Sequence, residues 1–376
     1  MSREAVIVST ARTPIGRGYR GAFNDTDAPT LGGHVIAEAV RRAGIEPGEI
    51  DDVIMGCAMQ QGSSGANIGR TAGVAAGLPS TVSGMSIDRQ CSSGMMAIAT
   101  AAKQIITDNM PIAVGGGLES ISLVQNEHRN GYRGQDPNVI AKSEHAYMSM
   151  LETAEIVSKR YSISRDQQDE YALQSQQRTA AAQEVGKFDD EIIPLPSKML
   201  FVDKETKQQS IHDVNLEKDE GNRPTTTLEG LNGLKPVFEG GVITAGNASQ
   251  LSDGASAAVL MDSKLAEQKG LQPLGAYRGI AVAGLDPDEM GIGPIYAVPK
   301  LLERFNLSVD DIGLWELNEA FASQCLYCRD ALDLDNEKYN VLGGSISIGH
   351  PFGMTGSRQT GLVLRELQRR NQKYGV

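Results

Sequence analysis

GIEPGEIDDVIMGCA, residues 44–58, and NLSVDDIGLWELNEA, residues 306–320, follow one pattern and start 262 positions apart, at Gly44 and Asn306. Each has an apolar residue, a short acidic turn, an isoleucine and then a run that predicts a buried strand. Any helix–turn–strand unit can look like this, so the match alone does not establish a repeat.

A second pair of stretches has nearly the same spacing. CSSGMMA at residues 91–97 aligns with HPFGMTG at residues 350–356, 259 positions apart. Each follows a run of small residues and opens a predicted helix. Two matches in the same order predict a duplicated βαβ unit. Because repeats packed about a pseudo-twofold axis bring equivalent positions together, we expect Cys91 and His350 to face one site from two helix N-termini.

The rest of the chain predicts an α/β protein, since short apolar runs alternate with helical patterns. Residues 120–247 differ because they are polar, rich in glutamine and interrupted by prolines. They predict a loop (lid) domain over the core. The predicted domains are the first half at 1–119, the loop domain at 120–247 with the last strand and helix of the first half resuming to about 270, and the second half at 271–376. Expected strands include 52–57, 111–116, 274–282 and 313–317.

Composition and charge exclude several classes of protein. The net charge is −12 and no basic stripe is present, so a nucleic-acid partner is not expected. No window approaches eighteen apolar residues, so no membrane span is expected. Without a secretory signal, four cysteines predict no disulfide framework and favour the cytoplasm. No metal-ligand spacing occurs. Three of the cysteines are interpreted as packing residues: Cys57, Cys325 and Cys328.

Cys91 is the candidate nucleophile. It lies in RQCSSGMMAI directly before a predicted helix. Unpaired N–H groups and the helix dipole there stabilise a thiolate, lower its pKa and can hold a developing oxyanion. A free cysteine is more often simply a small buried residue. The uncrowded turn and the pairing with His350 favour catalysis here.

His350 is the candidate base. It stands in SISIGHPFGMTG, where glycines let a ligand approach the backbone and Pro351 suits the first turn of a helix. An imidazole at such a terminus is kept neutral and can accept the proton of a thiol. The alternative is a structural histidine in a glycine-rich turn. The chain has only five histidines, and this one occupies the matched position, which favours catalysis.

Two further segments offer ligand contacts. Asn318 ends the expected strand 313–317, where α/β sheets place binding groups, and it can hold a water that donates to an oxyanion. Helix capping is the alternative. The run GNAS, residues 246–249, predicts a small-residue turn before a helix that suits a slender ligand arm. A flexible linker is the alternative there.

As a set, these motifs resemble the thiolase family. The segments are RQCSSGMMAI, GNASQLSDGA, the NEAF box at Asn318 and GHPFGMTG, with STARTPIGR from Ser9 and RPTTTLEGL from Arg223. They span nearly the whole chain in the family's order. The resemblance implies two α/β/α/β/α layered halves related by pseudo-twofold symmetry, with a loop domain inserted in the first. It also implies a homodimer or homotetramer.

The resemblance implies a reaction as well. Cys91 attacks the 3-keto carbon of a 3-ketoacyl-CoA, acetyl-CoA leaves, and free CoA takes the acyl group; in reverse, acetyl-CoA units condense. His350 would activate Cys91, and Asn318 would hold an oxyanion-hole water with His350. Coenzyme A is a substrate here, and neither another cofactor nor a metal is implied. The implied contacts are Ser249 and Ala248 at the pantetheine arm, Arg223 near the adenine, and a tunnel lined by Met150, Phe238, Met290 and Phe321.

One family motif is not found. The family has a second catalytic cysteine in a CxGGG motif after its last long helix, whereas KYGV closes this sequence at residues 373–376. In the first half the helix after Cys91 leads into the strand 111–116, but no strand is predicted after the helix 361–370. We therefore expect the second half to lack its final strand, with acyl transfer to Cys91 kept and carbon–carbon bond chemistry impaired.

Two other functions were weighed. A ketoacyl-synthase-like condensing enzyme shares the general fold, but it would need a histidine where Asn318 stands. A non-catalytic thiolase-like protein that binds acyl-CoA or lipid is the alternative of a different class. Preferential labelling of Cys91 by a thiol reagent distinguishes an enzyme from this binding protein.

Overall fold

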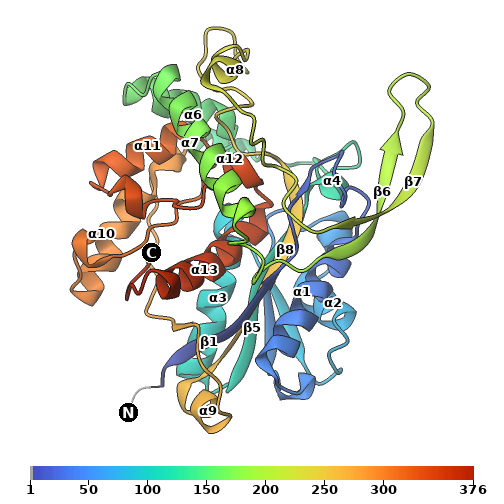
Figure 1. Cartoon of the computed structure of the whole chain (residues 1–376). Coiled ribbons are helices and arrows are strands. Elements are labelled where there is room, and N and C mark those ends of the chain that lie inside the picture. Colours follow the sequence, from blue (N-terminus) through green and yellow to red (C-terminus); the bar gives the residue numbers. More distant parts are fainter. Residues whose placement is uncertain (1–2) are drawn as a thin grey trace.

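The computed structural model describes residues 3–376. One seven-stranded sheet, in the order β4-β3-β5-β8-β1-β9 with β2 beside β8, forms the centre of the first half (Figure 1). β3 is parallel to β4 and β5, and β8 lies antiparallel between β5 and β1. The strands are β1 Ala5–Arg12, β2 Gly16–Arg17, β3 Asp52–Gly56, β4 Ser83–Ile87, β5 Ile112–Ser120, β6 Leu195–Val202, β7 Gln209–Leu216, β8 Ser252–Asp262 and β9 Gly275–Ala276.

Helices cover both faces of this sheet, which confirms the predicted α/β class. The α-helices are α1 Ala28–Ala43, α2 Ile68–Ala75, α3 Ser93–Lys103, α4 Ile121–Val124, α5 Pro137–Lys142, α6 Met150–Arg160, α7 Arg165–Glu184, α8 Leu228–Asn232, α9 Ser263–Gln268, α10 Pro294–Phe305, α11 Ala322–Ala331, α12 Ser345–Ile348 and α13 Phe352–Arg369. The short helices are η1 Pro47–Glu49, η2 Gly62–Ser64, η3 Gln90–Ser92, η4 Gln104–Asp108, η5 Pro287–Ile292, η6 Val309–Asp311 and η7 Asn336–Lys338.

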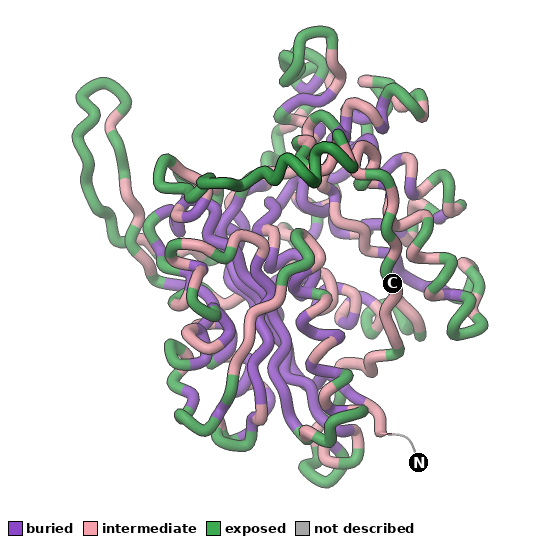
Figure 2. The backbone as a smooth tube through the Cα atoms, turned by 180° about the vertical axis from the view of Figure 1, so that it is seen from behind, coloured by how far each residue is buried: buried purple, intermediate pink, exposed green. Residues whose placement is uncertain are grey.

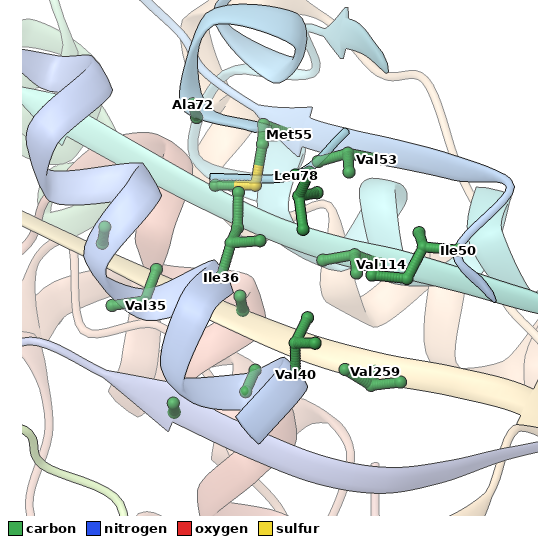
Figure 3. Packing of buried hydrophobic residues seen from close by; sticks show 14 of the residues in the cluster. Val35, Ile36, Val40, Ile50, Val53, Met55, Ala72, Leu78, Val114 and Val259 are labelled. Carbon is green, nitrogen blue, oxygen red and sulfur yellow. The ribbon is translucent and has the colours of Figure 1, made fainter. Parts of the chain in front are cut away.

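α1 covers one face of the sheet and builds the largest core. Proline stands in its first turn, and Gly44, at φ +63°, ends it in the left-handed region that favours glycine. Its apolar stripe meets side chains from β3, β5 and β8 (Figure 3). Each large aliphatic side chain buried there contributes about 1.5–3 kcal/mol. The labelled members are Val35, Ile36, Val40, Ile50, Val53, Met55, Ala72, Leu78, Val114 and Val259.

α3 and α13 lie side by side on the opposite face, and glycines let them approach closely. A Cβ on Gly94 of α3 would stand 2.5 Å from the carbonyl oxygen of Gly353 on α13. A Cβ on Gly353 would stand 2.3 Å from the oxygen of Leu118 and 2.5 Å from that of Gly56, at the ends of β5 and β3. The first turns of both helices are therefore pressed onto one edge of the sheet.

The duplicated turn is present in both halves. α1 ends at Gly44 with φ +63°, and α10 ends at Asn306 with φ +52°. A 3₁₀ turn follows each, closed by a capping box between Glu46 and Glu49 in the first half and between Ser308 and Asp311 in the second. The same sequence pattern thus gives the same backbone path 262 positions later.

Residues 374–376 continue the repeat. Gly375 forms a parallel bridge with Leu314, 262 positions after the parallel pair Asp52 and Ala113 of β3 and β5. The N–H of Gly313 donates to Tyr374 at 2.9 Å, and the N–H of Val376 donates to Leu314 at 3.0 Å. No named strand follows α13 in the described residues, but these backbone hydrogen bonds hold residues 374–376 against 313–316 as an isolated bridge.

Three local predictions differ from the structure. The strand expected at 313–317 is present only as isolated bridges at Leu314 and Trp315, because the segments beside it pair through single residues. Of the strand expected at 274–282, only Gly275–Ala276 is extended, because it pairs with β1 and the described residues beyond it find no neighbouring strand. The GNAS turn leads into β8 instead of a helix. The small residues of β8 are buried on both faces between β5 and β1, and such a run carries no clear helical or strand period.

The segment between β5 and β8 crosses the top of the molecule and is anchored by buried charges. Arg12 of β1 donates to Asp219 at 2.7 and 3.0 Å and to Glu191 at 2.9 Å. A bidentate guanidinium–carboxylate pair fixes both distance and orientation. α7 begins with a capping box, in which the side chains of Ser164 and Gln167 each accept from the backbone N–H of the other. The hairpin β6–β7 projects from this segment and is largely exposed, whereas the central strands of the large sheet, β3, β5, β8 and β1, are buried (Figure 2).

The glycine contact gives a stability prediction. We expect Gly353→Ala to lower the free energy of unfolding by about 1–3 kcal/mol or more, because the new methyl group meets fixed backbone oxygens. Gly361→Ala on the same helix is the control, since its nearest neighbour, Thr10, lies 3.5 Å away. Alanine there should be neutral or stabilise by up to about 1 kcal/mol. Urea unfolding of the two variants measures the difference, and equal midpoints would contradict this packing argument.

Candidate active site

Cys91 lies in the 3₁₀ turn η3 directly before α3, as the sequence predicts. Side chains hold this turn: the N–H of Arg89 donates to Ser93 Oγ at 2.8 Å, and that hydroxyl donates to the oxygen of Gln90 at 2.6 Å. Gln90 has φ +47°, a conformation that costs a non-glycine residue about 1–3 kcal/mol. Such local strain at the residue before a nucleophile marks a site whose geometry the surrounding structure imposes.

The protonation state of Cys91 differs from the sequence prediction. Loss of water around the sulfur and the nearby Glu119 carboxylate raise the pKa of Cys91 to about 12. Its own backbone N–H lowers the pKa, and Asp88 raises it further. The predicted lowering by the helix N-terminus is thus outweighed by burial and by Glu119. At neutral pH Cys91 is a thiol, so it needs a base before it can attack.

His350 is buried beside α13 and is oriented by a hydrogen bond on each ring nitrogen. Thr355 Oγ1 donates to the oxygen of Pro351 at 3.0 Å, so it accepts from His350 Nδ1–H at 2.7 Å. The proton therefore sits on Nδ1, and Nε2 carries a lone pair. Burial, reinforced by the positive charge of Arg358, lowers the pKa of His350 to about 3. The imidazole is neutral and can accept a proton at Nε2.

Asn318 contacts His350 directly. Its Nδ2 lies 3.1 Å from Nε2 of His350, and its Oδ1 accepts from Ser345 Oγ at 2.6 Å. The serine bond therefore aims the amide nitrogen at the imidazole. Helix capping, the alternative considered from the sequence, is not its role, since α11 begins at Ala322 with Phe321 as N-cap.

Immediate neighbours of the two candidate catalytic residues line one cavity. η3, which carries Cys91, packs against α13, whose first turn follows His350. The ring of Phe352 lies edge-on to the imidazole of His350, with centroids 5.1 Å apart. Gln90 and Phe352 both line an open cavity of about 340 Å³, a size typical of ligand sites. The full lining is Ala58, Met59, Gln60, Gln61, Gln90, Gln125, Arg129 and Phe352.

Four of the predicted CoA contacts lie next to this centre. Ala248 forms an antiparallel bridge with Phe321, and the N–H of Ser249 donates to Ala320 at 2.9 Å. Ala248, Phe321 and Met150 belong to one apolar cluster. The N–H of His350 donates to Gln250 at 2.9 Å, so the GNAS stretch runs from the NEAF box to the histidine.

The other three predicted contacts lie outside that cluster. Phe238 is 38% exposed and Met290 is 40% exposed. η5, which carries Met290, packs against α6, and the loop after Phe238 is held to α6 by Glu155, which accepts from Val242 N–H at 2.9 Å. Arg223 is exposed and is held through its backbone: its N–H donates to Gln176 at 2.8 Å, and its carbonyl oxygen accepts from Thr226 N–H at 3.0 Å. These residues border the site at the surface.

Glu319 is a site residue whose role the sequence reasoning missed. It is buried and accepts from Tyr171 at 3.0 Å, from Ser175 at 2.7 Å and from the N–H of Ile346 at 3.1 Å. It thereby fixes α7 of the loop segment and the start of α12 relative to Asn318. The signal was available, because an acidic residue directly after Asn318 in an otherwise apolar run must find buried donors.

The remaining cysteines are packing residues, as predicted. Cys57, Cys325 and Cys328 are buried free thiols. Burial raises the pKa of Cys328 to about 12. No group of three or more His, Cys, Asp or Glu side chains within residues 3–376 is placed to hold a metal ion. In the same range, no helix is long and apolar enough to cross a membrane.

The fold and this cysteine–histidine centre define an acyltransferase of the α/β class. Residues 5–264 match the family model "Thiolase, N-terminal domain", and residues 271–376 match "Thiolase, C-terminal domain". The chain belongs to the thiolase family.

Individual relatives agree with this assignment. The chain is 44% identical to the 3-ketoacyl-CoA thiolase of Bacillus subtilis (strain 168), over 100% of this chain and 95% of that protein. It resembles the structure of the Bacillus anthracis acetyl-CoA acetyltransferase with a TM-score of 0.86 and 43% identity, covering 100% and 94% of the two chains. For human mitochondrial 3-ketoacyl-CoA thiolase the TM-score is 0.87 at 36% identity, covering 99% and 94%.

The hydrogen bond that fixes the histidine gives a prediction. Thr355→Val removes the acceptor for Nδ1–H of His350, so the imidazole loses its fixed tautomer and orientation. We expect thiolase activity to fall about a hundredfold, the scale of a displaced general base. Thr360→Val is the matched control, because Thr360 on the same helix bonds only the oxygen of Gly356. Steady-state assays compare the thiolase activity of the two variants. Equal activity would show that Thr355 has no role in the mechanism.

Proposed function

We propose that this protein is a thiolase that transfers acyl groups between 3-ketoacyl-CoA and CoA through an acyl-Cys91 intermediate. The single observation that carries the proposal is the placement of His350, a buried imidazole with its proton on Nδ1 and an unprotonated Nε2 beside Asn318, directly before the helix packed on η3. That is the base which a Cys91 thiol with a raised pKa requires.

The proposed reaction proceeds in two transfers. His350 Nε2 takes the proton of Cys91, and the sulfur attacks the 3-keto carbon of the substrate. The bond between carbons 2 and 3 then breaks, carbon 2 takes up a proton, and acetyl-CoA leaves. The remaining acyl group stays on Cys91 as a thioester. The thiol of free CoA next attacks this thioester, releasing the shortened acyl-CoA and Cys91. In the opposite direction acetyl-CoA units condense.

The roles of the surrounding residues belong to the same proposal. Asn318, 3.1 Å from Nε2 of His350, would help to bind the developing oxyanion. The GNAS backbone, with Ala248 and Ser249, would contact the pantetheine arm, and Arg223 the adenine nucleotide. The tunnel toward Cys91 would be lined by Met150, Phe238, Met290 and Phe321. No cofactor is proposed, since CoA is itself a substrate.

We also propose a homodimer or homotetramer in the cytoplasm. Support for self-association is that β4 is the outer strand at one end of the sheet and is partly exposed, which leaves a backbone edge available for pairing. Several relatives are named as peroxisomal, so fractionation of the native host has to decide the compartment. The relatives' names do not support the alternative of a non-catalytic acyl-CoA-binding protein.

Acylation of the protein tests the function directly. After incubation with acetyl-CoA, mass spectrometry of the digested protein should find the acetyl group on the peptide that contains Cys91. His350→Ala should slow this acylation by about 10²–10⁴-fold, as expected for loss of a general base. Cys328→Ala is the control, because that thiol is buried away from the cavity and should not affect labelling. An unmodified Cys91 peptide in the wild-type protein would refute the proposal.

A further inference from the structure

A buried carboxylate that the proposed reaction does not use lies between the loop after β3 and the first turn of α13. Glu119, the second-last residue of β5, is fully buried. Its Oε2 accepts from the N–H of Ala58 at 3.0 Å and of Gly353 at 2.9 Å. Its Oε1 accepts from the N–H of Met59 at 3.0 Å and from Cys57 Sγ at 3.4 Å. The donors to this carboxylate thus come from two separate parts of the chain, residues 57–59 and Gly353.

These two parts belong to opposite halves of the molecule. Ala58 and Met59 form the loop after β3 and line the cavity, whereas Gly353 lies in the first turn of α13, three residues after His350. Glu119 is therefore the side chain that joins the cavity loop of the first half to the helix start that carries the histidine. Backbone N–H donors to a carboxylate are charge-assisted and strong, so the junction is rigid.

Glu119 also acts on the nucleophile through its charge. It is the charged group with the largest effect on Cys91, and a nearby negative charge disfavours a second one. The other charged or titratable groups around this corner are Asp88 and Arg89 before η3, Cys57 after β3 and His350 on α13. Asp88 is exposed and His350 is neutral. Glu119 is the one buried carboxylate among these groups.

We propose that Glu119 is a positioning residue that sets the first turn of α13, and with it His350, against the cavity loop, and that its negative charge acts on the Cys91 sulfur from that position. The proposal rests on the acyl transfer through Cys91 described above. It gives the enzyme a resting nucleophile that does not react with passing electrophiles. The proton then leaves Cys91 only where a substrate and the imidazole Nε2 are both present.

Alkylation and acylation separate the two parts of the proposal. In Glu119→Gln, which removes the charge at nearly constant size, iodoacetamide should modify Cys91 about tenfold faster at about pH 8, because the thiolate is favoured by roughly one pH unit. Acylation by acetyl-CoA should fall on the order of a hundredfold, because His350 is displaced from its productive position. If Cys91 of Glu119→Gln is acylated slowly but alkylated no faster than in the wild type, the defect is structural only, and the charge role is overturned.

Glu119→Asp tests position without loss of charge. We expect its alkylation rate to stay within about twofold of the wild type while acylation falls, since the shortened side chain cannot reach both Ala58 and Gly353. If the glutamine variant does not fold, this variant carries the test. Wild-type acylation in Glu119→Asp, or in both variants, would overturn the positioning role.

Glu155→Gln is the matched control. Glu155 likewise accepts from two successive backbone N–H groups, those of Val242 and Ile243, at 2.9 and 2.8 Å. It contributes nothing to the charge at Cys91, so its loss should leave the alkylation rate unchanged. A wild-type protein that alkylates at Cys91 but is never acylated would refute the acyl-transfer function alone, and the comparison of alkylation rates would still test Glu119.

Discussion

The structure depends on the close approach of two helix starts that carry no side chain at their contact. Gly94 of α3 and Gly353 of α13 are equivalent in the repeat, and each meets backbone atoms of the other helix or of the sheet edge. Any side chain there would separate the helices by the width of at least a methyl group. Cys91 and His350 each stand three residues before one of these glycines, so the packing that excludes side chains also brings together the two turns that carry them.

Burial at this contact sets the chemistry of both groups in opposite directions. It raises the pKa of the Cys91 thiol and lowers that of the His350 imidazole. The neutral pair is therefore favoured over a thiolate–imidazolium pair in the resting protein. Activation then has to come with the substrate, whose developing oxyanion offers a place for negative charge. Thr355 and Asn318 prepare for this by fixing the tautomer and the direction of the imidazole.

The sequence predicts the parts of the fold that rest on strong local patterns. The two turns at Gly44 and Asn306 have distinctive residues, and they recur with the same caps and the same strand register. The prediction fails where the outcome depends on partners far away in the chain. Residues 274–282 have apolar content, but the described residues beyond Ala276 have no neighbouring strand. The pKa of Cys91 depends on Glu119, and no local sequence pattern links the two residues. Cys91, His350 and Asn318 could be singled out because each stands at an element end, whereas Glu119 and Glu319 act through long-range contacts with buried donors.

The repeat also explains how one backbone supports different roles at equivalent positions. Gly56 and Asn318 are 262 positions apart; the first ends β3, and the second follows the matching segment, which forms isolated bridges at Leu314 and Trp315. The glycine admits the backbone of Ser93 at the start of α3, and the asparagine binds His350. The next residues, Cys57 and Glu319, are equivalent as well: one donates to a buried carboxylate, and the other is a buried carboxylate that accepts. A symmetric scaffold with identical side chains would place two thiols or two imidazoles in the cavity. Divergence at these few positions is what turns a doubled fold into a single site with a nucleophile from one half and a base from the other.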